Sequence, residues 1–356
     1  MYKISKPNND DLSAYCSNKA ALLRAVIESF INGETFQLQV RNRRTVQIGV
    51  GARTMTRKFL TSLLQVNKLE SYLAMSYVKQ KTLIEKLRQN TYSDEKIFKP
   101  LGAGIFDRHF DGTPEPYDDF NEICYEIFVN RGYETIDKSG FIREKQLRIC
   151  PYCGMEVVRE SDRSKRQIDH FLPKRKYPFL ALSYFNLIPA CDLCNEVPNK
   201  GATDPLVQRD SMKVIMHPYG FNDDIVRFHL DIADTNVYEP ENFSVVVGFK
   251  HKAYLDGYDS FFDISDRYAS SNQEASEDYT KLMEFKARHY YDEMNVNNDW
   301  LNKAYRAVTG YTVESDKPHL KARHRMRRDI FIQLNNLRQP DTYYIKGSGN
   351  NTVQLT

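Results

Sequence analysis

Four cysteines constrain this chain more than any other feature of its sequence. They form two tight pairs, in CPYC at 150–153 and in CDLC at 191–194. Each pair places two sulfur atoms on one turn, and two such turns can surround a zinc ion tetrahedrally. Because four thiolates complete the coordination shell, the predicted zinc is structural. The predicted ligands are Cys150, Cys153, Cys191 and Cys194.

The rest of the chain suggests a reducing compartment. Cys16 and Cys124 lie in helical-looking segments, and we expect them to be small buried hydrophobic side chains. The first residues, MYKISKPNNDD, lack the apolar stretch of a signal peptide. No apolar run approaches the roughly 18 residues that a membrane span requires. We therefore expect a cytoplasmic protein whose paired cysteines bind metal rather than form disulfides.

The composition is that of a soluble globular protein. Of the 356 residues, 41% are hydrophobic and 27% are charged. This length predicts about two to three domains. The net charge is only +3, so any contact with nucleic acid would depend on local basic patches and not on the overall charge.

The spacing of apolar residues predicts an α+β protein whose first part is mostly helical. Pairs of apolar residues recur every four positions from Leu22 to Ile31, which predicts a helix over 12–32. Further helices are expected at 53–66, 69–89, 117–131, 141–149, 274–295 and 318–335. Short strands are expected within 36–50 and at 226–232 and 243–249, and a mobile polar tail at 344–356.

The segment between the cysteine pairs carries the candidate catalytic residues. It contains QIDHFLPKRKYP, in which Asp169 precedes His170, and then YFNLIPA, which contains Asn186. Asn195 directly follows the last cysteine. Singly, an Asp-His pair is usually a hydrogen-bonded structural pair, and an asparagine is usually a turn or cap residue. Together and in this order they indicate a functional site.

The order D-H-x-x-P, N-L-x-P and C-x-x-C-N, after an earlier C-x-x-C, resembles the HNH endonuclease family and its ββα-metal fold. The resemblance covers 150–201. It implies that His170 is the general base that activates water, and that Asn186 braces the loop and orients this base. It also implies that Asp169 and Asn195 hold a catalytic divalent ion. Asn195 replaces the last histidine of the motif, which is a known variant in the family.

The chemistry of these side chains agrees with the implied roles. Phosphodiester hydrolysis needs an activated water and a cation beside the developing charge. A histidine with an ordinary pKa near 6.5 can accept the proton of that water. Carboxylate and amide oxygens favour Mg²⁺ or Mn²⁺, so zinc would support the fold and Mg²⁺ or Mn²⁺ would support catalysis. We expect 155–159 and 166–171 to pair as a β-hairpin.

We therefore expect three domains. Residues 1–140 form a mostly helical N-terminal domain, 141–210 form the HNH module with its structural zinc, and 211–356 form a C-terminal domain of mixed strands and helices.

Basic residues flank the Asp-His pair and follow the last cysteine. We expect them to contact phosphate, and a solvated charged face is the alternative. These residues are Lys165, Arg166, Lys174, Arg175, Lys176 and Lys200. A second basic run, HLKARHRMRRDIF at 319–331, either faces phosphate or pairs with acidic residues of a partner subunit. His217 is expected to pack before a turn.

The sequence thus predicts a metal-dependent HNH endonuclease that hydrolyses DNA phosphodiester bonds. The wider pattern is similar to nuclease subunits of bacterial antiphage systems, including Septu-type ones that work with an ATPase. This resemblance implies a defence role and an ATPase partner. The alternatives are a non-catalytic zinc-knuckle protein that binds nucleic acid and a scaffold subunit of a larger complex.

Overall fold

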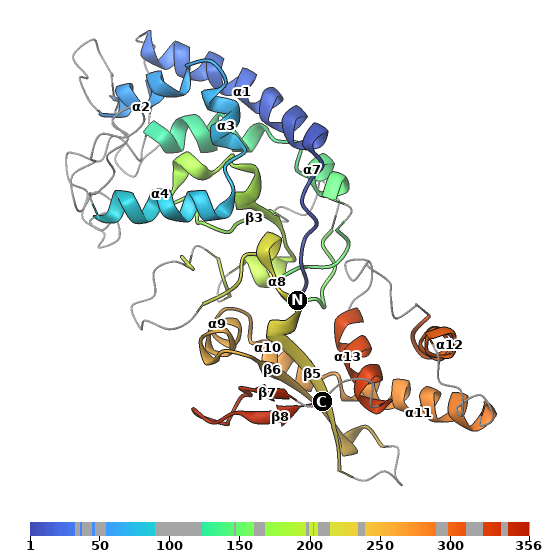
Figure 1. The fold of residues 1–356 in the computed structure, drawn as a ribbon. Helices are drawn as coiled ribbons and strands as arrows, with labels where there is room; N and C mark the ends of the chain where they lie inside the picture. Colours follow the sequence, from blue (N-terminus) through green and yellow to red (C-terminus); the bar gives the residue numbers. More distant parts are fainter. Residues whose placement is uncertain are drawn as a thin grey trace.

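The fold mixes helices with short antiparallel strand pairs (Figure 1). The computed structural model describes residues 1–32, 36–37, 45–46, 55–89, 123–145, 147–159, 168–196, 199–201, 203–205, 214–233, 239–289, 298–310, 323–335 and 341–355. Lys165 and Arg166 lie outside these residues, as does most of the segment 36–50 in which two strands were expected. Within that segment, β1 (Phe36–Gln37) pairs with β2 (Thr45–Val46).

The described parts of residues 1–145 are mostly helical, as their apolar spacing predicts. Their elements are α1 (Asn9–Ile31), α2 (Met55–Leu63), α3 (Lys68–Leu73), α4 (Tyr77–Gln89), the π-helix η1 (Tyr125–Asn130), the 3-10 turn η2 (Tyr133–Thr135) and α7 (Lys138–Lys145). The Asn8 side chain caps α1 by accepting a hydrogen bond of 2.7 Å from the Asp11 amide. The buried face of α1 packs on α2, α3 and η1. The single helix expected at 69–89 is two helices, because α3 ends at the cap residue Ala74.

Short elements follow and carry the candidate site. They are β3 (Ile168–His170), the 3-10 turns η3 (Pro178–Leu180) and η4 (Tyr184–Asn186), β4 (Leu187–Pro189) and α8 (Asp192–Asn195). β3 runs antiparallel to β4, with Asp169 opposite Ile188 and His170 opposite Leu187.

The hairpin expected between 155–159 and 166–171 is wrong in its described part. β3 pairs with β4, and Val157 forms a bridge with Ile149 instead. All three residues of β3 and all three of β4 are buried, whereas Val157 is exposed. An apolar strand covers β3 better than a polar one, so burial selects the more distant partner.

The last part of the chain combines one longer strand pair with helices. β5 (Val226–Ile232) and β6 (Phe243–Phe249) are antiparallel and confirm the two expected strands. The 3-10 turns η5 (Pro218–Gly220), η6 (Asp223–Ile225) and η7 (Pro240–Asn242) precede or separate them. The helices are α9 (Lys252–Phe262), α10 (Ile264–Ala269), α11 (Asn272–Arg288), α12 (Asn298–Thr309) and α13 (His324–Leu334). Helix α13 lies along β5, and α9, α10 and α11 contact β6 (Figure 1).

The polar tail is ordered, contrary to the expectation that it is mobile. β7 (Asp341–Tyr343) pairs with β8 (Val353–Leu355), and Tyr344 bridges to Phe249 at the end of β6. The turn between these strands contains Gly347 and Gly349, both with positive φ. Glycine adopts this conformation without a steric penalty, which lets a polar segment reverse its direction here.

The described part of the basic run, 323–331, makes contacts within the chain itself. Arg327 pairs with Asp278 on α11, and Arg323 donates a hydrogen bond of 2.9 Å to Glu274. Arg325 donates a bond of 2.7 Å to the Val226 carbonyl oxygen on β5. These three arginines therefore contact groups of this chain, and contact of the run with phosphate or with a partner subunit stays a prediction.

The main hydrophobic core contains buried side chains from all three expected domains. A smaller cluster joins α11, α12 and α13 around Trp300 and Tyr305. The boundaries near 140 and 210 stay a prediction. Among the described residues, no helix is both long and apolar enough to cross a membrane.

Candidate functional site

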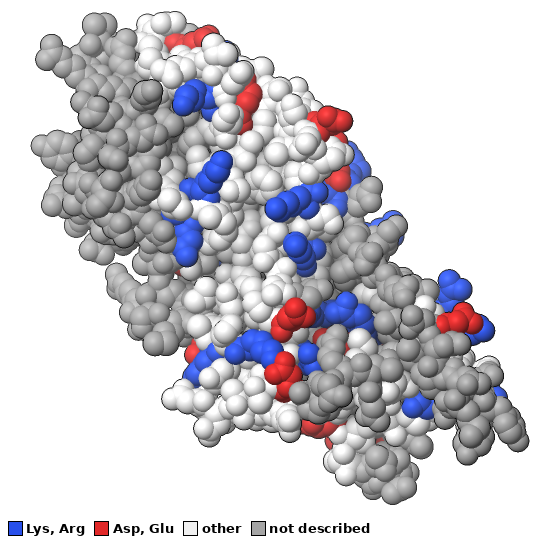
Figure 2. Space-filling view, in the orientation of Figure 1, with Lys and Arg blue, Asp and Glu red and all other residues white. Residues whose placement is uncertain are grey.

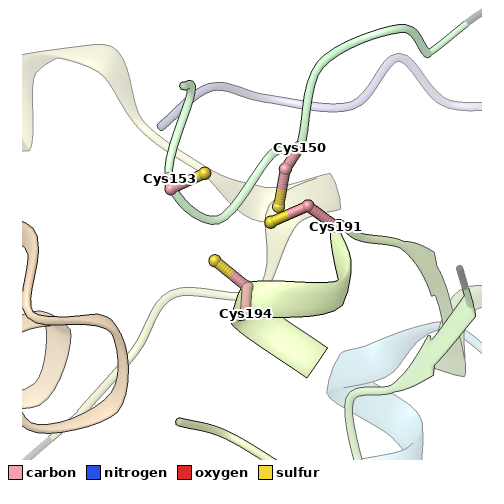
Figure 3. Close-up of side chains that lie close together, drawn as sticks. All are labelled: Cys150, Cys153, Cys191 and Cys194. Atoms are coloured by element: carbon pink, nitrogen blue, oxygen red, sulfur yellow. The ribbon is translucent and has the colours of Figure 1, made fainter. Parts of the chain in front are cut away.

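The four paired cysteines converge on one point (Figure 3). Their Sγ atoms all lie within 4.8 Å of one another, and all four side chains are buried. A Zn–S bond length of about 2.3 Å implies sulfur atoms roughly 3.8 Å apart in a tetrahedron. The cluster therefore has the composition and spacing of a structural zinc site. We searched the residues that the structure describes for groups of cysteine, histidine and acidic side chains that could hold a metal ion. These four cysteines are the group found.

Two tight turns bring the cysteines together. The Gly154 amide donates a hydrogen bond of 2.8 Å to the Cys150 carbonyl oxygen, and Gly154 has a φ of 70°. Cys191 is the N-cap residue of α8, so Cys194 lies one turn further along this helix. The first pair comes from a loop and the second from the start of a helix (Figure 3).

Helix α10 supplies a contact to the cluster that the sequence reasoning missed. The Arg267 Nη1 atom lies 3.6 Å from the Cys194 Sγ atom. The Tyr268 hydroxyl donates a hydrogen bond of 2.7 Å to the Cys153 carbonyl oxygen. A guanidinium beside the sulfur atoms offsets the negative charge of thiolates, and groups of this kind tune metal sites. The cluster therefore joins the central segment to the C-terminal part of the chain.

Asp169 is buried and contacts two polar side chains, those of Tyr152 and Lys200. The Tyr152 hydroxyl donates a hydrogen bond of 2.5 Å to its Oδ2 atom. The Lys200 Nζ atom lies 2.9 Å from each carboxylate oxygen and also donates a bond of 2.9 Å to the His170 carbonyl oxygen. Tyr152 lies between the two cysteines of CPYC, so the zinc turn positions a partner of Asp169.

His170 is held in one orientation. Its Nε2 atom lies 3.0 Å from the Ala181 carbonyl oxygen. A carbonyl oxygen only accepts hydrogen bonds, so Nε2 carries the hydrogen and the neutral ring keeps its lone pair on Nδ1. Burial lowers the pKa of His170 well below its ordinary value, and the nearby charge of Lys174 lowers it further. The ring is therefore neutral at pH 7, with one nitrogen able to accept a proton.

Asn186 ties down the loop that carries this carbonyl oxygen. Its Oδ1 atom accepts a hydrogen bond of 2.7 Å from the Leu172 amide. Its Nδ2 atom donates bonds of 3.1 Å to the carbonyl oxygens of Leu172 and Leu180. Because Leu172 begins this loop and Ala181 follows Leu180, Asn186 holds both ends of it. These bonds hold the loop in place, and the role of Asn186 in orienting a base stays a prediction.

Asn195 is placed by the cysteine cluster. It is the last residue of α8 and directly follows Cys194. Its amide donates a hydrogen bond of 3.0 Å to the Cys191 carbonyl oxygen. Its side chain is half-buried. A zinc ion bound to the cysteines would thus fix the position of this candidate ligand of a second metal.

Four of the six predicted phosphate-contacting residues are described by the structure, and they lie in different environments. Lys176 pairs with Asp204 at 2.9 Å, and Lys200 pairs with Asp169, so both ammonium groups are buried in ion pairs. Lys174 and Arg175 are on the surface or partly so. On the face seen in Figure 2, lysine and arginine side chains lie over both halves of the molecule, with acidic side chains among them. Phosphate contact by these residues stays a prediction.

His217 is buried, as its position before a turn predicts. The turn η5 begins at the next residue, Pro218. The His217 ring stacks on Tyr77, with the ring centroids 4.2 Å apart, and its Nε2 atom lies 2.8 Å from the Phe185 carbonyl oxygen. Burial lowers the pKa of His217 to about 3, so its ring is neutral at physiological pH.

The comparisons with known proteins find one short similarity. A segment of 46 residues is 41% identical to the Septu protein PtuB of Bacillus thuringiensis. The segment makes up 13% of this chain and 17% of that relative, so the similarity leaves most of both proteins unmatched. No protein-family model and no solved structure matches the chain.

Proposed function

We propose that the protein is an HNH-type endonuclease that hydrolyses phosphodiester bonds of DNA. The observation that carries this proposal is the arrangement of His170, Ala181 and Asn186. The Ala181 carbonyl oxygen holds Nε2 of His170, and Asn186 holds the loop on both sides. A buried histidine usually has its N–H paired in this way, as His217 has with the Phe185 carbonyl oxygen. His170 differs because a second side chain, Asn186, also holds the loop that carries the acceptor. A general base benefits from this support, because its lone pair must stay aimed at the attacking water.

The steps assigned to this chain follow from that geometry. Nδ1 of His170 accepts a proton from a water molecule as the water attacks phosphorus. The bond to the leaving 3′ oxygen then breaks, and this oxygen takes a proton from a solvent water, leaving a 5′-phosphate and a 3′-hydroxyl. The proton on the imidazolium passes to solvent, which restores the neutral ring that burial favours. Asn186 takes no part in proton transfer, since its amide stays neutral.

We further propose Mg²⁺ or Mn²⁺ as the catalytic ion, with Asp169 and Asn195 as its protein ligands. Their oxygen atoms are of the hard type that these ions favour. The ion would supply positive charge beside the phosphate and the leaving oxygen. The ammonium group of Lys200 already neutralises Asp169. Lys200 would therefore have to share this carboxylate with the ion.

The similarity to the Septu protein PtuB supports a role in antiphage defence. We propose that the chain acts as the effector of such a system together with an ATPase subunit. The alternative is a non-catalytic zinc-knuckle protein that binds nucleic acid or serves as a scaffold. The four-cysteine cluster fits both readings, whereas the support of His170 favours the nuclease.

The test is cleavage of supercoiled plasmid by the purified protein with Mg²⁺ or Mn²⁺, and with EDTA. We expect nicked or linear product with either ion and none with EDTA. His170→Ala should abolish cleavage while keeping the fold and zinc content of the parent, with a lower melting temperature because a buried ring is lost. His251→Ala is the matched control, since His251 is exposed at the start of α9 and should leave cleavage unchanged. Equal cleavage by His170→Ala and the parent would exclude His170 as the base.

A further inference from the structure

We propose that Lys138 and Lys174 together bind the substrate phosphate, and that Glu134 occupies this position in the free protein. The inference rests on the proposed nuclease function. It adds two residues that precede the HNH-like segment, Lys138 and Glu134, and it gives Lys174 a specific partner.

One carboxylate joins the two lysines. The Lys138 Nζ atom lies 3.1 Å from Oε2 of Glu134, and the Lys174 Nζ atom lies 3.2 Å from Oε1. Both ammonium groups also lie against Tyr133, at 4.8 Å and 4.6 Å from the centroid of its ring. Two positive charges are therefore held close together, with one anionic group between them. A phosphodiester likewise offers two anionic oxygen atoms on one centre, so the same pair of ammonium groups can hold it.

Tyr133 connects this lysine pair to the candidate base. Its ring meets the His170 ring edge to face, with centroids 4.4 Å apart. Its hydroxyl donates a hydrogen bond of 3.4 Å to the Ile168 carbonyl oxygen on β3. The charges of Lys174 and Lys138 both act on His170. The lysine pair is thus separated from the His170 ring by one aromatic ring.

Lys138, Lys174 and Glu134 are exposed enough for a substrate phosphate to replace Glu134 between the two lysines. Relative side-chain exposures are 31% for Lys174, 35% for Lys138 and 48% for Glu134. Ion pairs of such partly exposed groups contribute little to stability, so a phosphate can displace Glu134. Lys176 and Lys200 differ, because they are buried in pairs with Asp204 and Asp169. Those two lysines hold the structure, whereas Lys138 and Lys174 can reach a ligand.

The proposal makes predictions of opposite sign for the lysines and the acid. Lys138→Gln and Lys174→Gln should each weaken DNA binding roughly five- to tenfold. Each should also lower the slope of log K against log salt by about 1, since one phosphate contact is lost. Glu134→Gln should strengthen binding roughly two- to fivefold, because it removes the group that competes with phosphate. A purely structural ion pair would give no gain on loss of Glu134.

The experiment measures fluorescence anisotropy of a labelled DNA duplex over a range of salt concentrations. All variants are made in the zinc-loaded His170→Ala background, in which the duplex stays intact. Lys303→Gln and Asp299→Asn are matched controls, because they form an ion pair of the same i,i+4 spacing on α12. Both should bind DNA like the His170→Ala parent. Melting temperatures should agree among all variants.

The outcomes separate this inference from the proposed function. If the His170→Ala parent binds no duplex at any salt concentration, both the nuclease proposal and the inference are wrong. If the parent binds but the lysine variants match Lys303→Gln, the nuclease proposal survives and the phosphate pair does not. If Glu134→Gln binds no better than Asp299→Asn, the competition by Glu134 is excluded.

Discussion

The ammonium group of Lys200 lies 2.9 Å from both carboxylate oxygens of Asp169. Relative exposures of the two side chains are 0% and 2%. Since Lys200 also binds the His170 carbonyl oxygen, one cation fixes both residues of the Asp-His pair. A buried carboxylate next to a candidate base is thus neutralised by the chain itself.

Loss of Lys200 should be far more harmful than loss of an exposed lysine. Lys200→Met leaves the Asp169 charge buried without its partner, and we expect the free energy of unfolding to fall by about 3–5 kcal/mol. Lys252→Met is the control, because Lys252 pairs with Asp256 at 2.8 Å on the surface, and it should cost less than about 1 kcal/mol. Urea unfolding measures both. If the free energy of unfolding falls equally in the two variants, the ion pair of Lys200 and Asp169 is not buried in solution.

Asn186 should matter for both stability and catalysis. Asn186→Ala removes three hydrogen bonds to the loop. At roughly 1 kcal/mol per bond, we expect the free energy of unfolding to fall by about 2–4 kcal/mol. Cleavage should also fall, because the loop no longer holds the Ala181 carbonyl oxygen against His170. Asn335→Ala removes a single bond on α13 and serves as the control. Full cleavage by a folded Asn186→Ala protein would contradict the role of Asn186 in orienting the base.

His217 should make the fold sensitive to acid. Its pKa is about 3 in the folded protein and near 6.5 when unfolded, so the unfolded chain binds the proton more readily between these values. Its contribution to stability is therefore complete above pH 6.5 and is lost as the pH falls toward 3. The loss approaches about 1.4 kcal/mol per pH unit.

The check is urea unfolding at pH 7, 6 and 5 for the parent, His217→Phe and His251→Gln. The stability of the parent relative to His217→Phe should decline as the pH falls. Relative to His251→Gln it should stay nearly constant. A constant difference between the parent and His217→Phe would mean that His217 binds its proton equally well in the folded and the unfolded chain.

The cysteine cluster should bind zinc and require it for folding. Cys191→Ser should lose zinc and melt at a lower temperature, because structural zinc binding is coupled to folding. Cys124→Ser is the control, since Cys124 is a buried cysteine outside the four-cysteine cluster. This variant should keep the zinc content of the parent. Elemental analysis and thermal melting measure the two effects. A Cys191→Ser protein with the zinc content of the parent would rule out this residue as a ligand.

The local spacing of residues in the sequence was sufficient to predict several features. Two C-x-x-C turns predict a common metal because each turn positions its own sulfur pair, and the four Sγ atoms are indeed together. The strands 226–232 and 243–249 follow from alternating apolar residues, and they form as predicted. The order of Asp169, His170 and Asn186 pointed to one site, since each lies near the others on β3 or just before β4.

Long-range contacts decided the rest. The partner strand of β3 depends on which apolar segment covers it, and the nearby segment 155–159 was the wrong choice. The Lys200 ammonium contacts Asp169 only because the chain returns after α8. Glu134 lies beside Lys174 because η2 packs next to the loop that follows β3. The spacing of residues in the sequence cannot predict these strand and ion pairs. Burial and charge neutralisation act on residues that meet only after the chain has folded.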